Sequence, residues 1–71
     1  MSTNPPSVAE LVRQKVLTRT GRRVKELVVE VGGNRVVLRG KTLSFHVKQL
    51  AQTGAQEAMP GAQLNNAIVV E

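Results

Sequence analysis

The 71-residue sequence contains no cysteine, tryptophan, tyrosine or aspartate, and its aromatic content is a single phenylalanine. The absence of cysteine excludes disulfides and thiolate metal sites, and it suits a reducing compartment. The shortage of aromatic residues removes the base-stacking side chains that RNA-recognition sheets need. No apolar run approaches the length of a signal peptide or a membrane span. We therefore expect a single cytoplasmic domain.

Positive charge is the main feature of the remaining composition. Ten lysine and arginine residues stand against five glutamates, which gives a net charge of +5. Such a balance favours anionic partners, namely nucleic acid, anionic lipid or an acidic protein. A chain of this size buries only about 60% of the surface that it exposes when unfolded, so we expect a small core.

The N-terminal part of the sequence predicts a tail followed by a helix. Residues 1–6 are polar and contain two prolines, which indicates a disordered tail, and residues 7–71 form a single domain. Ser7 and Glu10 have the spacing of a capping box, and Gly21 follows Thr20 as a C-terminal stop. The expected apolar stripe of this helix consists of Val8, Leu11, Val12 and Val16.

Two strands and a tight turn follow the helix. Residues 24–31 alternate between apolar positions on one face and mostly charged positions on the other, and residues 35–40 continue this alternation. The Gly-Gly-Asn segment between them tolerates the positive φ angles of a short hairpin turn.

This hairpin has two candidate registers. A turn centred on the glycine pair places Glu26 opposite Arg39. A turn centred one residue later places Glu26 opposite Lys41 and Val28 opposite Arg39. Both registers keep the apolar residues on one face, so the pattern leaves both open.

A second amphipathic helix and a last strand complete the domain. Ser44 is the expected N-cap, and Met59-Pro60-Gly61 ends the helix before a strand over residues 64–70. Gly54 inside the helix costs on the order of 1 kcal/mol relative to alanine, which suggests close approach to a neighbour. Apolar or small residues recur at helical spacing at Val47, Leu50, Ala51, Gly54, Ala55 and Ala58.

These elements predict an α+β fold with the order α-β-β-α-β. The three strands form one sheet, and both helices pack on the same face because the other face carries charges. The predicted core consists of Val12, Leu27, Val29, Val36, Leu38, Leu50, Ala51, Ile68 and Val70.

Four segments in this order resemble the BON domain, a small module of bacterial osmotic-response and envelope proteins. They are VVLRG at 36–40, similar to the family's V-x-L-x-G; the alanine-rich helix after Ser44; Pro60-Gly61; and LNNAIVV at 64–70, with Asn66 at the family's asparagine. The resemblance covers about residues 8–71. It implies a helix-strand-strand-helix-strand fold and a non-enzymatic binding role, which in the family is often proposed to involve phospholipid or envelope surfaces.

The sequence offers no arrangement for catalysis. Ser7 and Ser44 are explained as helix caps, and His46, the only histidine, has no aspartate or cysteine to pair with. The glutamates fall on solvent faces, where paired acid–base catalysis has no enclosed site. We expect no enzymatic activity, no cofactor, no metal and no small-molecule substrate.

Basic residues form one candidate binding surface. The densest cluster is Arg19, Arg22, Arg23 and Lys25. One interpretation is that these cations interact with the dipole at the C-terminus of the first helix. The other is an anion-binding patch, which would be extended by Arg35, Arg39 and Lys41 if these residues lie nearby.

The outer face of the second helix is another candidate surface for a partner. It carries Phe45, Gln49, Gln52 and Gln56, with Lys48 beside them. An exposed Phe45 would anchor a protein or an interfacial lipid contact. Alternatively, Phe45 folds over the sheet edge as part of the core.

Three classes of function follow from these features. The first is a BON-like binding module that contacts anionic phospholipid or envelope surfaces, or a protein partner. The alternative is a small basic nucleic-acid-binding domain, which is disfavoured because the second helix carries Lys48 as its only cation. The third class is a protein-interaction or oligomerisation module that uses an exposed edge strand.

Overall fold

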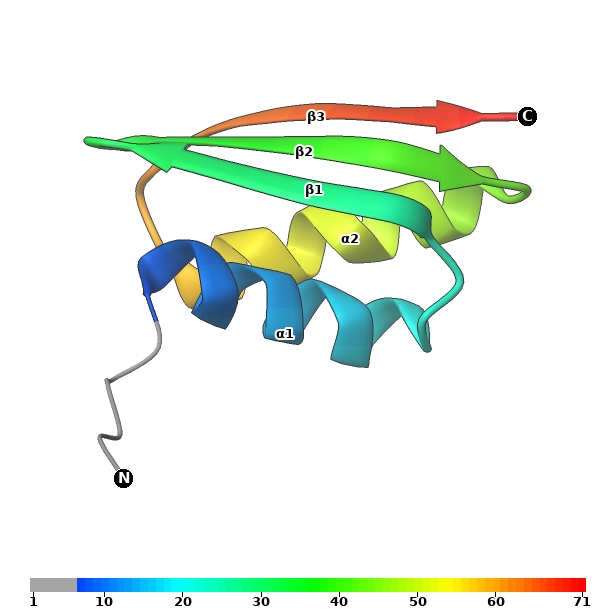
Figure 1. Ribbon diagram of the computed structural model, residues 1–71, viewed down its shortest axis with the longest axis horizontal. Coiled ribbons are helices and arrows are strands. Elements are labelled where there is room, and N and C mark those ends of the chain that lie inside the picture. The colour runs from blue at the N-terminus through cyan, green and yellow to red at the C-terminus, as the bar shows by residue number, and fades with distance from the viewer. Residues whose placement is uncertain (1–6) are drawn as a thin grey trace.

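The computed structural model describes residues 7–71, and the disordered tail predicted for residues 1–6 lies outside the described residues. Helices and strands follow one another in the predicted order (Figure 1). They are α1 (Val8–Thr20), β1 (Lys25–Gly32), β2 (Arg35–Thr42), α2 (Phe45–Ala58) and β3 (Gln63–Val70). This arrangement confirms the α+β fold class.

The three strands form one sheet with β2 in the centre. β1 pairs with β2 antiparallel, and β3 pairs with β2 parallel. Both helices lie against the same face, and the opposite face is open to solvent (Figure 1). Because α2 carries the chain back along the sheet, the end of α1, the β2–α2 turn and the end of β3 lie at the same end of the molecule.

The ends of α1 are those that the sequence predicts. The Ser7 hydroxyl accepts a hydrogen bond from the Glu10 amide at 3.2 Å, and Gly21 takes up a left-handed φ of 63°. The predicted apolar stripe is partly wrong. Val12 and Val16 are buried, but Leu11 keeps 49% of its surface because the buried line continues along the helix to Thr20, away from Leu11. Val8, at the first position of the helix, is equally exposed.

The β1–β2 hairpin adopts the second of the two predicted registers next to its turn. Val28 pairs with Arg39, as a turn centred on Gly33 and Asn34 requires. Gly33 has a φ of 58°, which glycine adopts without a Cβ penalty.

A β-bulge interrupts this register near the start of β1. The pairing shifts by one residue between Val28 and Lys25, so that Glu26 and Leu27 together lie opposite Gly40. Glu26 has a φ of 55°, in the left-handed region that glycine often occupies in bulges. This shift moves Glu26 out of the direct pairing with Lys41 that the register alone predicts.

Gly40 provides the space for this bulge. A Cβ atom at this position would lie 2.7 Å from Val24 Cγ1 and 2.9 Å from the main-chain oxygen of Lys25. The strand is longer than predicted, since β2 continues past Gly40 to Thr42. The glycine therefore serves close packing within the sheet and does not end the strand.

A small aliphatic core fills the space between the helices and the sheet. Its buried apolar residues are Val12, Val16, Val24, Val36, Leu38, Val47, Ala51, Ala55 and Ile68. Leu27 and Val29 pack against its edge, and Leu50 is half-buried. The prediction for Val70 is wrong. This residue keeps 38% of its surface because it ends an edge strand, and no further strand among residues 7–71 lies on its outer side.

Two contacts fix α2 in place. Gly54 faces the main chain of α1, which confirms the close approach predicted for this glycine. On the other side of the helix, Asn66 Nδ2 donates to the main-chain oxygen of Lys48 at 2.8 Å, and Asn66 Oδ1 accepts from the Ile68 amide at 3.3 Å. Asn66 therefore links α2 to β3.

Candidate functional site

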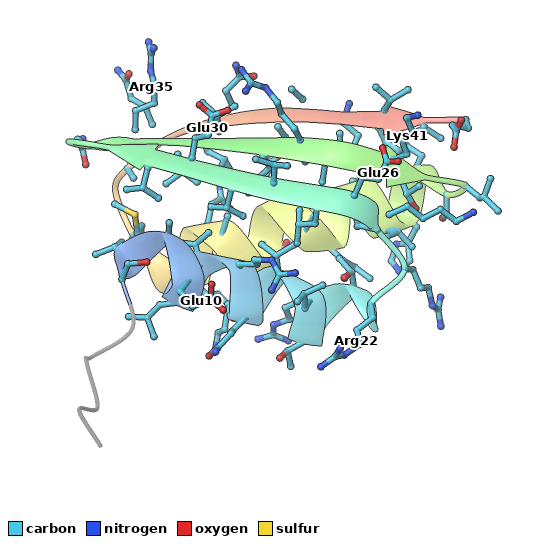
Figure 2. All side chains as sticks on the ribbon, viewed as in Figure 1. Glu10, Arg22, Glu26, Glu30, Arg35 and Lys41 are labelled. Atoms are coloured by element: carbon cyan, nitrogen blue, oxygen red, sulfur yellow. The ribbon has the colours of Figure 1, made fainter. Side chains whose placement is uncertain are left out.

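The seven basic residues of the predicted anion-binding patch do not lie on one surface. Arg35 and Lys41 of β2 project from the open face of the sheet (Figure 2). Arg39 faces the same way, because it lies an even number of positions from both. The other four come from the last turn of α1, the connection to β1 and the first residue of β1. The structure therefore divides the predicted patch into two groups.

Arg19, in the first of these groups, forms an ion pair within the fold. Its Nε and one terminal nitrogen donate to the two carboxylate oxygens of Glu57 at 2.6 and 2.5 Å. These hydrogen bonds lower the pKa of Glu57 and raise the pKa of Arg19. The pair connects α1 to α2, which gives Arg19 a structural role.

The cations on the open face of the sheet are also largely paired. Arg39 donates to Glu30, and the Lys41 ammonium lies 3.8 Å from a Glu26 oxygen. Arg35 forms no ion pair within residues 7–71 and lines a shallow polar hollow with Gln63, Leu64 and Asn65. Arg35 and Lys41 are six positions apart along β2, which is about 20 Å of strand. This face therefore lacks a concentrated positive charge.

The connection between α1 and β1, together with the first residue of β1, carries the cations that remain. Arg22, Arg23 and Lys25 are exposed and form no ion pair in the described part of the chain. Arg22 lies at the end of α1 (Figure 2) and has a φ of 61° directly after the left-handed Gly21. Two consecutive left-handed residues turn the chain sharply from the helix toward the sheet.

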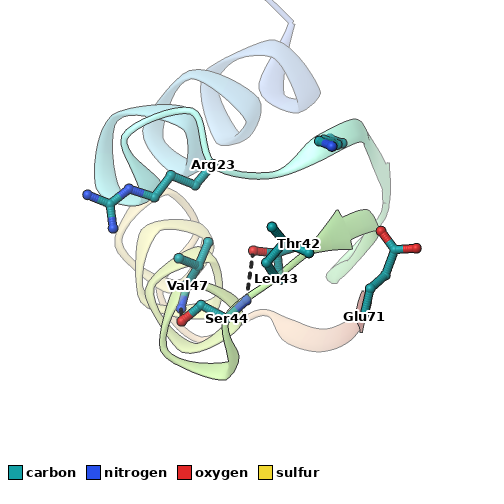
Figure 3. A pocket seen from close by; sticks show the side chains of 7 residues that line it. Arg23, Thr42, Leu43, Ser44, Val47 and Glu71 are labelled. Carbon is teal, nitrogen blue, oxygen red and sulfur yellow. Dashed lines mark hydrogen bonds between the residues drawn. The ribbon is translucent and has the colours of Figure 1, made fainter.

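A pocket of about 300 Å³ opens beside this connection (Figure 3). Buried Val47 and Thr42 belong to its wall, and the Thr42 hydroxyl accepts from the Ser44 amide at 3.4 Å. Arg23 and Lys25 also line the pocket. The pocket therefore combines an apolar wall with two cations and the carboxylate of Glu71. Its full lining is Arg23, Lys25, Thr42, Leu43, Ser44, Val47 and Glu71.

Two large apolar side chains are exposed at the same end of the molecule. Leu43, in the turn between β2 and α2, keeps 76% of its surface, and Phe45, the first residue of α2, keeps 62%. The exposure of Phe45 decides against the alternative in which it folds into the core. Leu43 was missed by the sequence analysis, and its position between a strand and a helix cap was the available signal. We refer to this end as the loop end, defined by Arg22, Arg23, Lys25, Leu43 and Phe45.

The outer face of α2 extends away from the loop end. Gln49, Gln52 and Gln56 are exposed, and Lys48 is half-buried. Gly54 and Glu57 face α1, so these amides lie on the side of α2 turned away from α1. The structure thus groups the predicted partner-binding residues on one flank, with Phe45 at its loop-end limit.

Few groups in the structure are suited to chemistry. His46 is exposed, and within residues 7–71 no three histidine or acidic side chains lie close enough together to hold a metal ion. None of the described helices has the length and apolar character required to cross a membrane.

Comparisons with known proteins find no relative of this chain. No protein-family model matches it, and no curated protein or solved structure does so either.

Proposed function

We propose that this protein is a non-enzymatic binding module, BON-like in type, whose loop end contacts anionic phospholipid surfaces. The observation that carries the proposal is the pairing of two exposed apolar side chains, Leu43 and Phe45, with three cations that lack acidic partners among residues 7–71. Interfacial membrane contacts combine these two chemistries.

Each half of the loop end supplies a separate contribution. A basic residue near an anionic bilayer contributes about 1 kcal/mol, so Arg22, Arg23 and Lys25 bring the protein to the surface. Burying a large apolar side chain contributes about 1.5–3 kcal/mol. Leu43 and Phe45 then supply the part of the binding that does not depend on charge.

Two further features support a lipid surface over nucleic acid. The cations on the open face of the sheet are largely paired with glutamates, which leaves no long basic track for a phosphate backbone. The exposed aromatic content of the loop end is one side chain, whereas single-strand binding stacks successive bases on several. The resemblance of four segments to the BON domain supports the same class of function.

Co-sedimentation with vesicles tests the proposal. We expect the protein to pellet with vesicles of phosphatidylglycerol and phosphatidylcholine at low salt, and to pellet much less with phosphatidylcholine alone. The double variants Arg22→Ser/Arg23→Ser and Leu43→Ser/Phe45→Ser should each pellet less. Arg35→Ser and Leu11→Ser are matched controls, because both change exposed residues away from the loop end.

Two outcomes would count against the proposal. Equal pelleting of the wild type and the Arg22→Ser/Arg23→Ser variant would remove this cluster from the mechanism. If the wild type does not pellet with anionic vesicles, a protein partner that contacts Phe45 and the outer face of α2 becomes the better explanation. A parallel titration with DNA at two salt concentrations tests the nucleic-acid alternative.

A further inference from the structure

The two edges of the sheet are protected very differently. The edge formed by β1 carries the bulge at Glu26 and the charges of Lys25, Glu26 and Glu30. Bulges and charges are the devices by which natural edge strands avoid pairing with another chain. The edge formed by β3 is as long as β1, but it has no charge, no proline and no bulge, and its pairing with β2 is continuous from Gln63 to Val70.

The main chain of β3 leaves hydrogen-bonding groups on its outer side. The amides of Gln63 and Glu71 donate toward the β2 side of the strand, to Asn34 and Thr42. Main-chain direction alternates along a strand, so the amides and carbonyls of alternate residues point outward. The outward residues are Leu64, Asn66, Ile68 and Val70. Of their amides, that of Ile68 donates to the Oδ1 atom of Asn66, and the other three have no partner within residues 7–71.

We propose that the β3 edges of two copies of this chain pair antiparallel about a two-fold axis. The three-stranded sheet then continues into a six-stranded sheet in the dimer. A strand without charge gives no like-charge repulsion when it meets itself, and a two-fold contact leaves only the two protected β1 edges exposed.

The sequence of β3 fits one such register. With Ala67 at the two-fold axis, each Leu64 lies opposite Val70 of the partner copy, and each Asn66 lies opposite Ile68. The outward main-chain groups of all four residues then form hydrogen bonds with the partner copy. Pairing Leu64 with Val70 also covers an apolar residue that keeps 38% of its surface in the single chain. In the dimer, a main-chain hydrogen bond to the partner copy replaces the 3.3 Å hydrogen bond that the Ile68 amide donates to Asn66 Oδ1 in the single chain.

The flank of α2 next to β3 is compatible with this contact. Asn66 bonds to the main chain of Lys48, which places the first turns of α2 beside the β3 edge. Lys48 is the one cation of this flank, and its long side chain allows the ammonium group to reach solvent.

This inference does not rest on the proposed lipid contact. Antiparallel pairing of β3 places the two loop ends at opposite ends of the dimer, because each loop end lies at the C-terminal end of β3 (Figure 1). The two proposals therefore succeed or fail separately.

Sedimentation equilibrium from micromolar to millimolar protein tests the dimer. We expect a monomer–dimer equilibrium for the wild type. Ala67→Lys places two ammonium groups opposite each other at the axis, so it should raise the dimer dissociation constant at least about tenfold. Ala67 is exposed on the open face, so the monomer should keep its fold. Val28→Lys, at an exposed position on the other edge strand, is the matched control and should dimerise like the wild type.

Hydrogen exchange gives a second measurement that needs no variant. The amides of Leu64, Asn66 and Val70 should become protected as the protein concentration rises. A wild type that stays monomeric at millimolar concentration would overturn the proposal. It would also be overturned by a dimer that Ala67→Lys and Val28→Lys weaken equally, or by a dimer in which the three β3 amides exchange freely.

Discussion

A Cβ atom on Gly54 would lie 3.1 Å from the Cα atom of Val16, so the two helices meet there main chain to main chain. The main-chain oxygen of Lys15 would lie even closer, at 3.0 Å. Neither neighbour is the end of a flexible side chain. The separation of α1 and α2 is therefore set by the absence of a side chain at position 54.

Gly54→Ala should lower the free energy of unfolding by about 1 kcal/mol. Alanine gains about 1 kcal/mol of helix propensity, but overpacking against two main-chain atoms of α1 costs about 1–3 kcal/mol. Gly54→Val should cost more, because its larger side chain adds to the same clash. Urea melts followed by circular dichroism would measure both. A higher midpoint for Gly54→Ala would show that the helices separate easily.

Gly40→Val should lower the free energy of unfolding by about 2 kcal/mol or more, since the side chain has to displace Val24 and the Lys25 main chain. The φ of Gly40 is 157°, which adds strain for any other residue. Gly61→Val is a useful comparison. It also has a positive φ, but nothing lies within 4 Å of a Cβ atom there. An equal loss in both variants would attribute the effect to φ alone.

Glu26→Gly should stabilise the domain by roughly 0.5–1 kcal/mol. A non-glycine residue in the left-handed region costs about 1–2 kcal/mol, and part of this gain is offset by the greater freedom of glycine in the unfolded chain. The exposed pair with Lys41, at 3.8 Å, contributes little. Glu26→Val should destabilise, because a β-branched residue fits this φ worst. Equal melting midpoints for both variants would place the bulge elsewhere in solution.

Glu57→Gln should make the melting midpoint of the domain less sensitive to pH in acid. Hydrogen bonds from Arg19 lower the pKa of Glu57 below its ordinary value of 4.5 in the folded chain. The ion pair therefore stabilises the domain above that pH, and this stabilisation is lost as the pH falls through the lowered pKa. Melting midpoints between about pH 5 and pH 3 should fall more steeply for the wild type than for the variant. Parallel curves would show that the pair does not persist in solution.

The salt dependence of vesicle binding should distinguish the cations of the loop end from its apolar side chains. Raising the salt concentration from about 0.1 M to 1 M shortens the screening length from about 10 Å to 3 Å. Vesicle binding by Leu43→Ser/Phe45→Ser should disappear over this range, because only charge remains. The weaker binding by Arg22→Ser/Arg23→Ser should change little. The same salt dependence in both variants would contradict this division of roles.

Local signals in the sequence account for most of the fold. The helix boundaries follow from the Ser7 and Ser44 caps, and the burial of Ala51 and Ala55 follows from helical spacing. The bulge was not predictable because no glycine or asparagine occupies position 26, and the strain there is supported by contacts made with Gly40, fourteen residues later.

The candidate site was predictable only in part. Arg22 and Arg23 were identified because basic residues are dense in this part of the sequence. Arg19 belongs to the same cluster but has a different role, since it pairs with Glu57 of α2. Leu43 was missed because a single apolar residue between a strand and a cap belongs to no periodic pattern. Its role depends on the fold, which brings the α1–β1 connection, the β2–α2 turn and the end of β3 to one end of the molecule (Figure 1).

The exposure of Phe45 has a practical consequence for every measurement on this protein. A chain without tryptophan or tyrosine hardly absorbs at 280 nm and has no useful intrinsic fluorescence, and its one aromatic ring lies in water in the folded state as in the unfolded state. Unfolding is therefore optically silent except in the far ultraviolet. For the same reason, an indole introduced by Leu43→Trp would be the only fluorophore in the molecule, and a blue shift of its emission would report directly on the environment of the loop end.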